Sequence, residues 1–425
     1  MSLADLYDDI ARCNRCGFCQ VACPVFRATG HESGVARGRL ALLRALIEGR
    51  LVWTRDLEAP LYDCLRCGAC TANCFPAVAT ADLVGVARGE YLDRVGRGPL
   101  HRILFDQLLP NPRRLRLVAR LAAAGKRSGV PRVVRALGLL RSFGRDFLRA
   151  EQIVERFPAR PYRDGDRSAV LPGTGELRIG YFVGCGIDLL RPQAAAATVG
   201  LLRRLGRTVQ VLDNCCCGLP ADTYGDRQAA ARLAARNLER IDPQALDVVV
   251  TDCSSCASCL KRYPDLFPEG DPRRGAAGEL AARVRDLVEL LPRLPAAPAA
   301  PSEPVIATYH DPCHAVRGQQ LSREPRAALR ALPGVELREL PEADWCCGGA
   351  GAYALSHFDL SLAVLNRKLD NVEKTGAGLL VTSCPACVIQ LAYGVRLRGL
   401  PVQVCHLSEV LASRQAAPTT AEPYR

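Results

Sequence analysis

Two runs of cysteines that share one spacing constrain this chain more than any other feature. The runs are Cys13-x-x-Cys16-x-x-Cys19-x-x-x-Cys23 and Cys64-x-x-Cys67-x-x-Cys70-x-x-x-Cys74. This spacing is typical of segments that hold 4Fe–4S clusters, because three closely spaced thiolates wrap one corner of a cluster. The first run is followed at once by Pro24, as in the bacterial pattern, whereas the second has its proline one place later, at Pro76. The runs predict two iron–sulfur clusters and electron transfer.

The fourth cysteine of each run is expected to bind the cluster of the other run, as in two-cluster ferredoxins. The first cluster would then take Cys13, Cys16, Cys19 and Cys74, and the second Cys64, Cys67, Cys70 and Cys23. Disulfides and zinc are the alternatives. No apolar signal segment follows Met1, so we expect the chain in the reducing cytoplasm. Zinc sites prefer two separated cysteine pairs, often with histidine, so iron–sulfur fits these runs better.

Composition argues against two classes of protein, nucleic-acid-binding proteins and transmembrane proteins. The formal net charge is +12, yet this number counts every cysteine as neutral. Thiolate-bound clusters carry negative charge, so the loaded protein would be closer to neutral. No basic run is interleaved with aromatic residues, so nucleic-acid binding is not predicted. No stretch of 18 uncharged apolar residues is present, so no transmembrane segment is expected.

The first part of the chain reads as helical. An apolar pattern at helical spacing over residues 38–49 lies between the two runs, and it predicts a helical ferredoxin-like domain over residues 1–97. Residues 98–175 are expected to be a helical connector whose residues 158–175 form a loop. Its apolar positions are Leu115, Leu117, Val118, Leu121, Val133, Val134, Leu137, Leu139 and Leu140, among many arginines. Such helices either pack on neighbouring domains or offer a docking face for a membrane surface or a partner subunit.

From residue 176 onward, short apolar runs alternate with helical patterns, which predicts parallel α/β sheets. Strands are expected at 179–183, 209–212, 248–251, 305–309, 335–340 and 378–382. Helices are expected at 192–205, 227–241, near 324–332, 357–374 and 385–397. A Pro/Ala-rich linker at 291–304 separates two α/β domains over 176–290 and 305–425.

Ten cysteines repeat in one frame along these two domains, at an offset of 128–131 residues. The first set is Cys185, Cys216, Cys217, Cys253 and Cys256, and the second is Cys313, Cys346, Cys347, Cys384 and Cys387. Internal duplication explains this frame. Ligands of parallel sheets gather at the carboxyl ends of strands, where helix N-termini offset negative charge. Five thiolates at one rim favour iron–sulfur, with zinc second. The remaining alternative is a set of reduced, buried packing residues.

Five further residues lie near this frame but outside it. Cys259 and Cys405 are interpreted as incidental, and Cys215 competes with its neighbour Cys216 as a ligand, although alignment on the following glycine favours Cys216. His310 and His314 flank Cys313. Each either donates a hydrogen bond to a cluster sulfur and so tunes its potential, or merely packs.

The motifs of the duplicated frame resemble those of a known family. Tyr309-His310-Asp311-Pro312-Cys313-His314 and Trp345-Cys346-Cys347-Gly348-Gly349-Ala350-Gly351 are similar to segments of the glycolate/lactate oxidase iron–sulfur subunits, and the resemblance covers nearly the whole chain. It implies a multidomain fold: an N-terminal α-helical ferredoxin-like domain, then two duplicated α/β Cys-Cys-Gly (cysteine-rich) domains. The same domains occur in a subunit of heterodisulfide reductase, where five cysteines hold a noncubane 4Fe–4S cluster used in disulfide chemistry.

The resemblance also implies a function. We expect two cubane 4Fe–4S clusters and one or two further 4Fe–4S clusters, cubane or noncubane, in the Cys-Cys-Gly domains. The chain would be the electron-transfer subunit of an oxidoreductase, with a FAD-containing partner that oxidises a 2-hydroxy acid and a quinone or another carrier as acceptor. No nucleotide-binding glycine motif follows a predicted strand, which agrees with a separate flavoprotein. A thiol–disulfide oxidoreductase is the alternative, since both cysteine sets are complete where relatives retain fewer. The protein is expected in the cytoplasm, free or peripheral on the inner face of the membrane.

Overall fold

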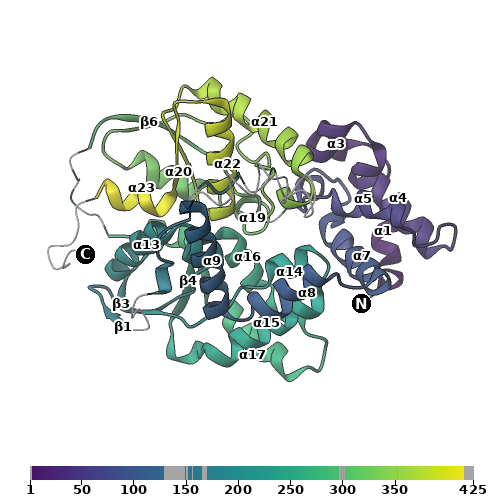
Figure 1. Ribbon diagram of the computed structural model, residues 1–425, viewed down its shortest axis with the longest axis horizontal. Helices are drawn as coiled ribbons and strands as arrows, with labels where there is room; N and C mark the ends of the chain where they lie inside the picture. The colour runs from purple at the N-terminus through teal and green to yellow at the C-terminus, as the bar shows by residue number, and fades with distance from the viewer. Residues whose placement is uncertain are drawn as a thin grey trace.

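The protein has a helical N-terminal part beside two α/β units, as the ribbon in Figure 1 shows. The structure is a computed structural model that describes residues 2–128, 149, 152–155, 157–164, 170–295, 298, 300, 302–351 and 353–415. The fold class expected from the sequence is confirmed: a helical dicluster region precedes two units built on parallel sheets.

Short helices around two long ones make up the N-terminal part. They are α1 (Tyr7–Ala11), α2 (Phe18–Ala22), α3 (Pro24–Thr29), α4 (Ala36–Ile47), α5 (Glu58–Tyr62), α6 (Ala69–Ala72) and α7 (Thr80–Val95). The apolar pattern between the cysteine runs forms α4, which buries Leu40 and Leu43 in a core of its own. The cysteine runs lie in the loops and short helices between these elements.

The connector begins with α8 (Pro99–Arg102), a π-helical turn at Ile103–Leu108 and α9 (Pro112–Arg127). The helix expected around Leu115–Leu121 is therefore present. The second apolar series, at residues 133–140, lies outside the described residues. Residues 170–172 were expected in a loop, but they form β1 (Val170–Pro172), which pairs antiparallel with the edge of the first sheet. A three-residue edge strand has too little pattern to be recognised from the sequence.

The first α/β unit holds a five-stranded sheet in the order β1-β3-β2-β4-β5. Its further strands are β2 (Leu177–Tyr181), β3 (Gly206–Val211), β4 (Val248–Thr251) and β5 (Val284–Asp286). Its helices are α12 (Cys185–Leu190), α13 (Pro192–Leu205), α14 (Leu219–Thr223), α15 (Arg227–Arg240), α16 (Ser254–Lys261), α17 (Pro272–Arg283) and α18 (Leu287–Leu290). Apart from β1, neighbouring strands are parallel.

The second unit repeats this topology in a four-stranded sheet of order β7-β6-β8-β9. The strands are β6 (Val305–Tyr309), β7 (Val335–Leu337), β8 (Leu379–Thr382) and β9 (Gln403–His406). The helices are α19 (Cys313–Val316), α20 (Arg323–Arg330), α21 (Phe358–Thr375), α22 (Pro385–Arg398) and α23 (Leu407–Ser413). When the antiparallel edge strand β1 is left aside, the first strand of each unit (β2 or β6) lies between the second (β3 or β7) and the third (β4 or β8). This reversal of strand order is where parallel α/β sheets bind ligands.

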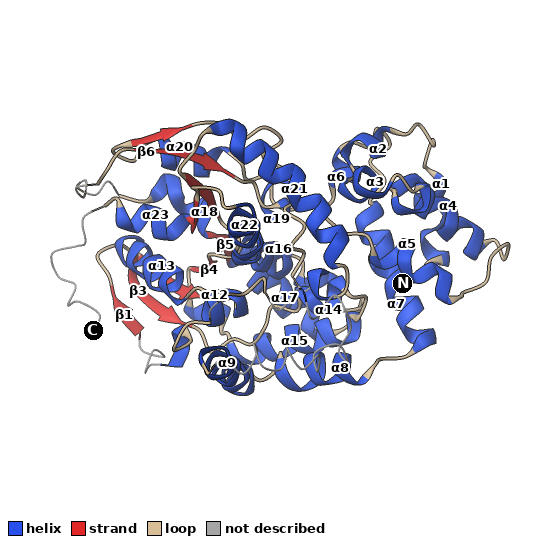
Figure 2. Ribbon diagram, turned by 45° about the horizontal axis from the view of Figure 1, so that its top comes forward, coloured by secondary structure: helices blue, strands red, loops and turns tan. Residues whose placement is uncertain are grey.

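The two α/β units pack against each other through helices, which Figure 2 labels, and the packed pairs are related in a pseudo-twofold manner. Helix α12 of the first unit packs on α22 of the second, and α16 of the first packs on α19 of the second. These are equivalent helix pairs, because α12 and α19 follow the first strand of each unit and α16 and α22 follow the third. Buried residues of both units form one continuous apolar core. The relative placement of the two units is therefore fixed by packing.

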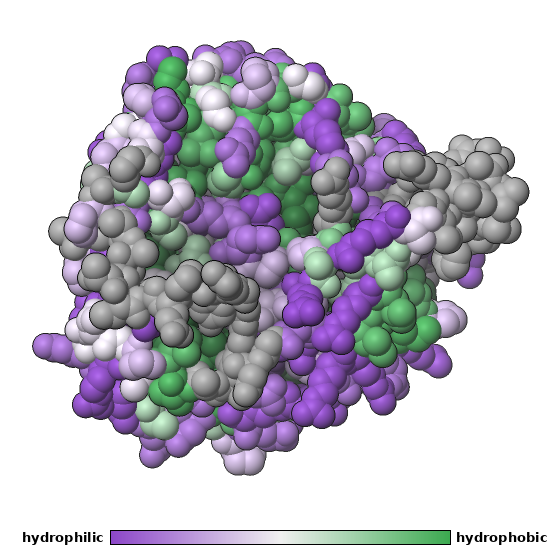
Figure 3. All heavy atoms as spheres, turned by 60° about the vertical axis from the view of Figure 1, so that its left-hand side comes forward, coloured by the Kyte–Doolittle hydropathy of each residue, from purple (hydrophilic) through white to green (hydrophobic). Residues whose placement is uncertain are grey.

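Among the described helices, none is both long and apolar enough to cross a bilayer. On the face seen in Figure 3, hydrophilic side chains interrupt the apolar areas.

Candidate functional site

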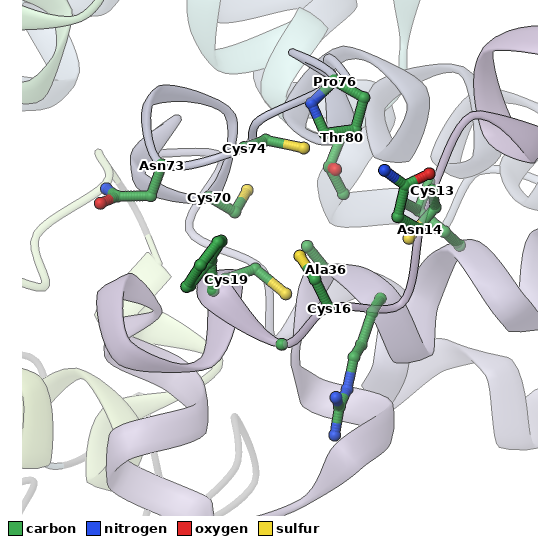
Figure 4. Close-up of a pocket in the computed structure, with 14 residues that line it drawn as sticks. Cys13, Asn14, Cys16, Cys19, Ala36, Cys70, Asn73, Cys74, Pro76 and Thr80 are labelled. Carbon is green, nitrogen blue, oxygen red and sulfur yellow. The ribbon is translucent and has the colours of Figure 1, made fainter.

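The first cysteine run lines a pocket at the outer side of the N-terminal part. Cys13, Cys16, Cys19 and Cys74, which were expected to bind one cluster, all line it, together with Cys70. Figure 4 shows these side chains around one space. Cys16 is exposed, whereas the other four are half-buried. The pocket therefore brings together the expected ligand set and lies close to the surface.

A second pocket lies deeper and is lined by the other expected set, Cys23, Cys64, Cys67 and Cys70. Cys70 lines both pockets, so the two candidate sites are adjacent. Burial raises the pKa of the Cys23 thiol. Such a site favours thiolates only when positive charge compensates them, as the positively charged iron–sulfide core of a cluster does.

Both runs follow the same backbone path. The residue before the second cysteine of each run, Arg15 or Arg66, has positive φ (55° and 50°), and so does the glycine after that cysteine, with φ of 88° at Gly17 and 73° at Gly68. A short helix begins directly after each of these glycines. The shared spacing thus produces a shared loop in which successive thiols turn toward one side. Two equivalent loops support two equivalent centres.

Two buried arginines supply positive charge beside the deeper pocket. Arg39 and Arg88 are 2% and 3% exposed. Burial would raise the pKa of the Cys64 thiol, but these two guanidinium groups, together with the backbone N–H and the charge of Arg66, outweigh burial and lower that pKa. Burial lowers the pKa of Arg88 to about 10, so its guanidinium stays charged at neutral pH. Arg88 also donates hydrogen bonds to the carbonyls of Leu61 (2.7 Å) and Cys64 (2.5 Å), which fix the second run.

The deeper pocket meets the second α/β unit directly. The thiol of Cys67 contacts the thiol of Cys346, and an apolar cluster that contains Cys23 and Cys346 joins α3 to α21. Arg317 spans the same boundary, because its guanidinium donates to the Cys67 carbonyl (3.4 Å) and pairs with Asp344 (2.7 Å). The second ferredoxin run is thus next to the second unit, although the first unit comes first in the sequence.

The structure brings the five framed cysteines of each unit together at the carboxyl ends of the strands. In the second unit the sulfurs of Cys347 and Cys387 lie 3.4 Å apart. In that unit Cys346 contacts Cys313 and Cys347, and Cys384 contacts Cys387. In the first unit Cys216 contacts Cys185 and Cys217, and Cys256 contacts Cys217 and Cys253.

The two sets meet at the pseudo-twofold axis. The thiol of Cys253 contacts the thiol of Cys384. Beside them Ser254 donates its backbone N–H to the Ser383 carbonyl (3.2 Å), and their hydroxyls share a hydrogen bond of 2.9 Å. A continuous series of thiol contacts therefore runs from Cys67 through the second unit into the first. Spacing alone did not predict either junction, since both depend on how the domains pack.

The glycine of each Cys-Cys-Gly motif is required by the neighbouring helix. Gly218 and Gly348 have φ of 95° and 81°. A Cβ at Gly348 would meet the Ser361 carbonyl oxygen of α21 at 2.6 Å, and one at Gly218 would meet the Ala230 carbonyl oxygen of α15 at 3.2 Å. These glycines let the helix approach the thiol loop closely, and they permit a left-handed backbone.

The cysteines outside the frame fall into two kinds. The Cys215 thiol is 2% exposed and donates to the Leu233 carbonyl (3.6 Å), on the side of α15. Cys405 is half-buried on β9. Cys259, interpreted as incidental, lies beside the first set, where its thiol donates to the Cys217 carbonyl (3.2 Å). Its place one helical turn after Cys256 is the signal that was available in the sequence.

Two buried polar side chains, His310 and Lys368, and the half-buried His314 lie around the second set. Among the described residues neither ring nitrogen of His310 has a hydrogen-bond partner, and its donor atom lies within 4.8 Å of those of Cys347 and Cys387. His314 is held through its Nδ1 by the Ser255 hydroxyl at 3.2 Å. Lys368 is 0% exposed and donates to the carbonyls of Glu342 and Ala343.

Comparison with known proteins agrees with this geometry. A 4Fe–4S dicluster domain model matches residues 9–77, and a cysteine-rich domain model matches residues 179–261 and 307–392. A third model, the linker region of the glycolate oxidase iron–sulfur subunit, matches residues 96–154. The chain therefore contains a dicluster domain and two cysteine-rich domains.

Curated relatives cover the chain at moderate identity. The chain is 29% identical over 415 residues to the probable glycolate oxidase iron–sulfur subunit of Bacillus subtilis, and the match spans 95% of this chain and 93% of that protein. It is 34% identical over 241 residues to lactate utilization protein A of Geobacillus thermodenitrificans, and that match spans 56% of this chain and all of the relative. This chain belongs to the family of glycolate oxidase and lactate-utilisation iron–sulfur subunits. The resemblance expected from the sequence is confirmed, and with it the assignment to an oxidoreductase complex.

Another relative has a different activity in its name. The chain is 30% identical over 237 residues to a subunit of the fumarate reductase (CoM/CoB) of Methanothermobacter marburgensis, and the match spans 55% of this chain and 46% of that protein. Part of the chain is therefore similar to a protein that is named for another redox activity.

Proposed function

We propose that this family member is the electron-transfer subunit of a flavin-dependent glycolate or lactate oxidase or dehydrogenase. Substrate oxidation would take place on a FAD-containing partner subunit, and a quinone or another carrier would accept the electrons. The names of the relatives support the oxidised substrate class. The observation that carries the proposal is the continuous series of thiols from the N-terminal pockets to the first α/β unit.

The donor set fits iron–sulfur groups residue by residue. We assign Cys13, Cys16, Cys19 and Cys74 to one cubane cluster and Cys64, Cys67, Cys70 and Cys23 to the other. We assign Cys185, Cys216, Cys217, Cys253 and Cys256 to a centre in the first unit and Cys313, Cys346, Cys347, Cys384 and Cys387 to one in the second. Bound clusters supply one-electron redox chemistry. The chain's own part is to hold these sites in series and to compensate their charge.

The proposed series has two ends that approach the surface. Cys16 is exposed at the N-terminal end, and Cys185 is half-buried at the other. One end would face the flavoprotein and the other the acceptor. We place the complex in the cytoplasm, free or peripheral on the inner face of the membrane. The exposed apolar side chains of α9, Leu117 and Leu121, lie among arginines and support a peripheral contact.

The test uses the complex purified anaerobically with its flavoprotein. Glycolate or lactate should reduce the iron–sulfur sites. This reduction is monitored by visible absorbance and by low-temperature EPR. Cys346→Ser removes the thiol contact between the second ferredoxin run and the second unit, and with it one proposed ligand of the second-unit centre. We expect this variant to uncouple reduction of the cubane pair from reduction of the two cysteine-rich units. Cys215→Ser is the matched control, since Cys215 is outside the series. Equal reduction of every site in Cys346→Ser would contradict the proposed order.

A thiol–disulfide oxidoreductase is the second candidate. The complete cysteine sets and the Cys253–Cys384 contact between the units support it. In this case a reduced chain would be reoxidised by a small disulfide without any flavoprotein. Reoxidation by disulfide at a rate that exceeds reoxidation by quinone would favour this function over the first.

A further inference from the structure

The two α/β units share one topology, but the polar surroundings of their cysteine sets differ. In each unit a buried tyrosine ends the first strand, Tyr181 in β2 and Tyr309 in β6. The next residue is Phe182 in the first unit and His310 in the second. Their backbone N–H groups donate to equivalent neighbours, the carbonyls of Val250 (2.8 Å) and Val381 (2.9 Å). Phe182 and His310 are therefore structurally equivalent positions.

A second difference lies on the helix behind the Cys-Cys-Gly loop. Ala230 of α15 and Ser361 of α21 face the motif glycines in the same way. Seven residues later stand Asn237 in the first unit and Lys368 in the second, and both are fully buried. A neutral amide in one unit is thus a cation in the other.

These two side chains of the second unit lack the partners that buried polar groups normally have. Among the described residues neither ring nitrogen of His310 has a well-formed hydrogen bond, the Cys347 thiol is close enough to interact with the ring, and the imidazole is 1% exposed. Lys368 forms no ion pair with any described carboxylate, and only carbonyls receive its ammonium. By contrast, Asn237 is satisfied by the backbone N–H of Cys215 (2.9 Å) and the carbonyl of Cys216 (3.1 Å). Unpaired buried cations and orphaned imidazoles are costly.

A negatively charged iron–sulfur centre on the five cysteines of the second unit would satisfy both groups at once. We propose that His310 donates an N–H hydrogen bond to the Cys347 sulfur and that the Lys368 ammonium compensates charge there, which holds the second-unit centre at a higher reduction potential than the first-unit centre. This inference rests on the proposed occupancy of both units. Hydrogen bonds to sulfur and local positive charge both favour the reduced, more negative state. The centre next to Cys67 would then be the first of the two to be reduced.

The experiment is an EPR-monitored redox titration of the full chain purified anaerobically, with iron and sulfide counted in each sample. Signals are assigned to a unit by their loss in Cys217→Ser or Cys347→Ser. Lys368→Gln removes the charge, and Lys368→Arg retains it. His310→Phe installs the residue of the first unit, and His310→Gln retains an N–H donor.

We expect Lys368→Gln and His310→Phe to shift the second-unit signal to lower potential and to leave the first-unit signal unchanged. Lys368→Arg and His310→Gln should shift the potential of the second-unit signal less. Pulsed EPR on ¹⁵N-histidine-labelled protein should show a weak nitrogen coupling that His310→Phe removes. A strong coupling would indicate iron-bound nitrogen and overturn the hydrogen-bond assignment.

Other outcomes separate this inference from the proposed function. Unchanged potentials with full iron content would refute the role of His310 and Lys368 alone. An equal shift of both signals would refute it too. Loss of iron in Lys368→Arg as well as in Lys368→Gln would show a structural role, because the charge is retained in one of them. No iron in either α/β unit of the unmodified chain would instead refute the occupancy on which the inference depends.

Discussion

Replacement of Arg88 by Met should destabilise the deeper N-terminal site and its contact with the first α/β unit. Arg88 lies on α7 and is 3% exposed. Its guanidinium donates to the carbonyls of Leu61, Cys64 and Thr223, with donor–acceptor distances of 2.5 to 2.7 Å. Methionine preserves most of the apolar stem and leaves these buried carbonyls without a donor.

The magnitude follows from the loss of a buried charge with several hydrogen bonds. A buried carbonyl left without its donor costs about 1–3 kcal/mol, so the three carbonyls together should cost at least about 3 kcal/mol. The matched control is Arg94→Met on the same helix. Arg94 is a more exposed residue, which pairs with Glu90 at 3.4 Å and lies 4.6 Å from the Trp53 ring centroid. Its replacement should cost about 1 kcal/mol or less.

The assay follows iron release to a chelator and far-UV circular dichroism against urea concentration, on the loaded chain under anaerobic conditions. We expect a clearly lower midpoint of iron release for Arg88→Met, with a signal loss that begins at the second cubane. The midpoint for Arg94→Met should be close to that of the unmodified chain. Equal midpoints for both variants would refute the conclusion that the Arg88 hydrogen bonds hold the second cysteine run.

Three further predictions concern backbone, ligand choice and pH. Gly348→Ala should lose more stability than Gly351→Ala in thermal unfolding. Both glycines have positive φ, but a Cβ at Gly348 would meet a carbonyl oxygen at 2.6 Å, whereas one at Gly351 would meet nothing within 4 Å. Equal losses of stability would contradict this prediction. Cys215→Ser should keep the full iron content, whereas Cys216→Ser should lose iron. The reverse result would show that Cys215, and not Cys216, is the ligand. Burial raises the pKa of Asp286 to about 6. Its carboxylate is therefore disfavoured in the fold, and stability should fall by about 3 kcal/mol as the pH rises from about 4 through 6. Asp286→Asn should flatten this pH dependence in urea titrations, and an unchanged slope would count against it.

The sequence predicted the architecture well where strands are apolar and long enough. The runs at 179–183, 248–251 and 305–309 correspond to β2, β4 and β6 because buried parallel strands are almost continuously apolar. By contrast, β5 (Val284–Asp286) and β9 (Gln403–His406) were missed. They are short, partly polar edge strands, and their pairing comes from tertiary contacts.

The sequence predicts which cysteines belong to each candidate site, but it does not predict which sites lie next to each other. The frame indicates which thiols share a unit, since equivalent positions follow equivalent strands. It does not indicate that Cys67 meets Cys346 or that Cys253 meets Cys384, because those contacts depend on the packing between domains. In the sequence, nothing distinguishes Lys368 from the other polar residues of its helix. Only the fold shows that it is buried beside the second set.

The measurement that tests the central claim most directly is iron and sulfide analysis of the full chain purified anaerobically, combined with EPR of Cys347→Ser and Cys217→Ser. Four occupied sites in series predict about sixteen iron atoms per chain. Each variant should lose the iron of one α/β unit and keep both cubane signals. About eight iron atoms in the unmodified chain, with no change in either variant, would contradict the account.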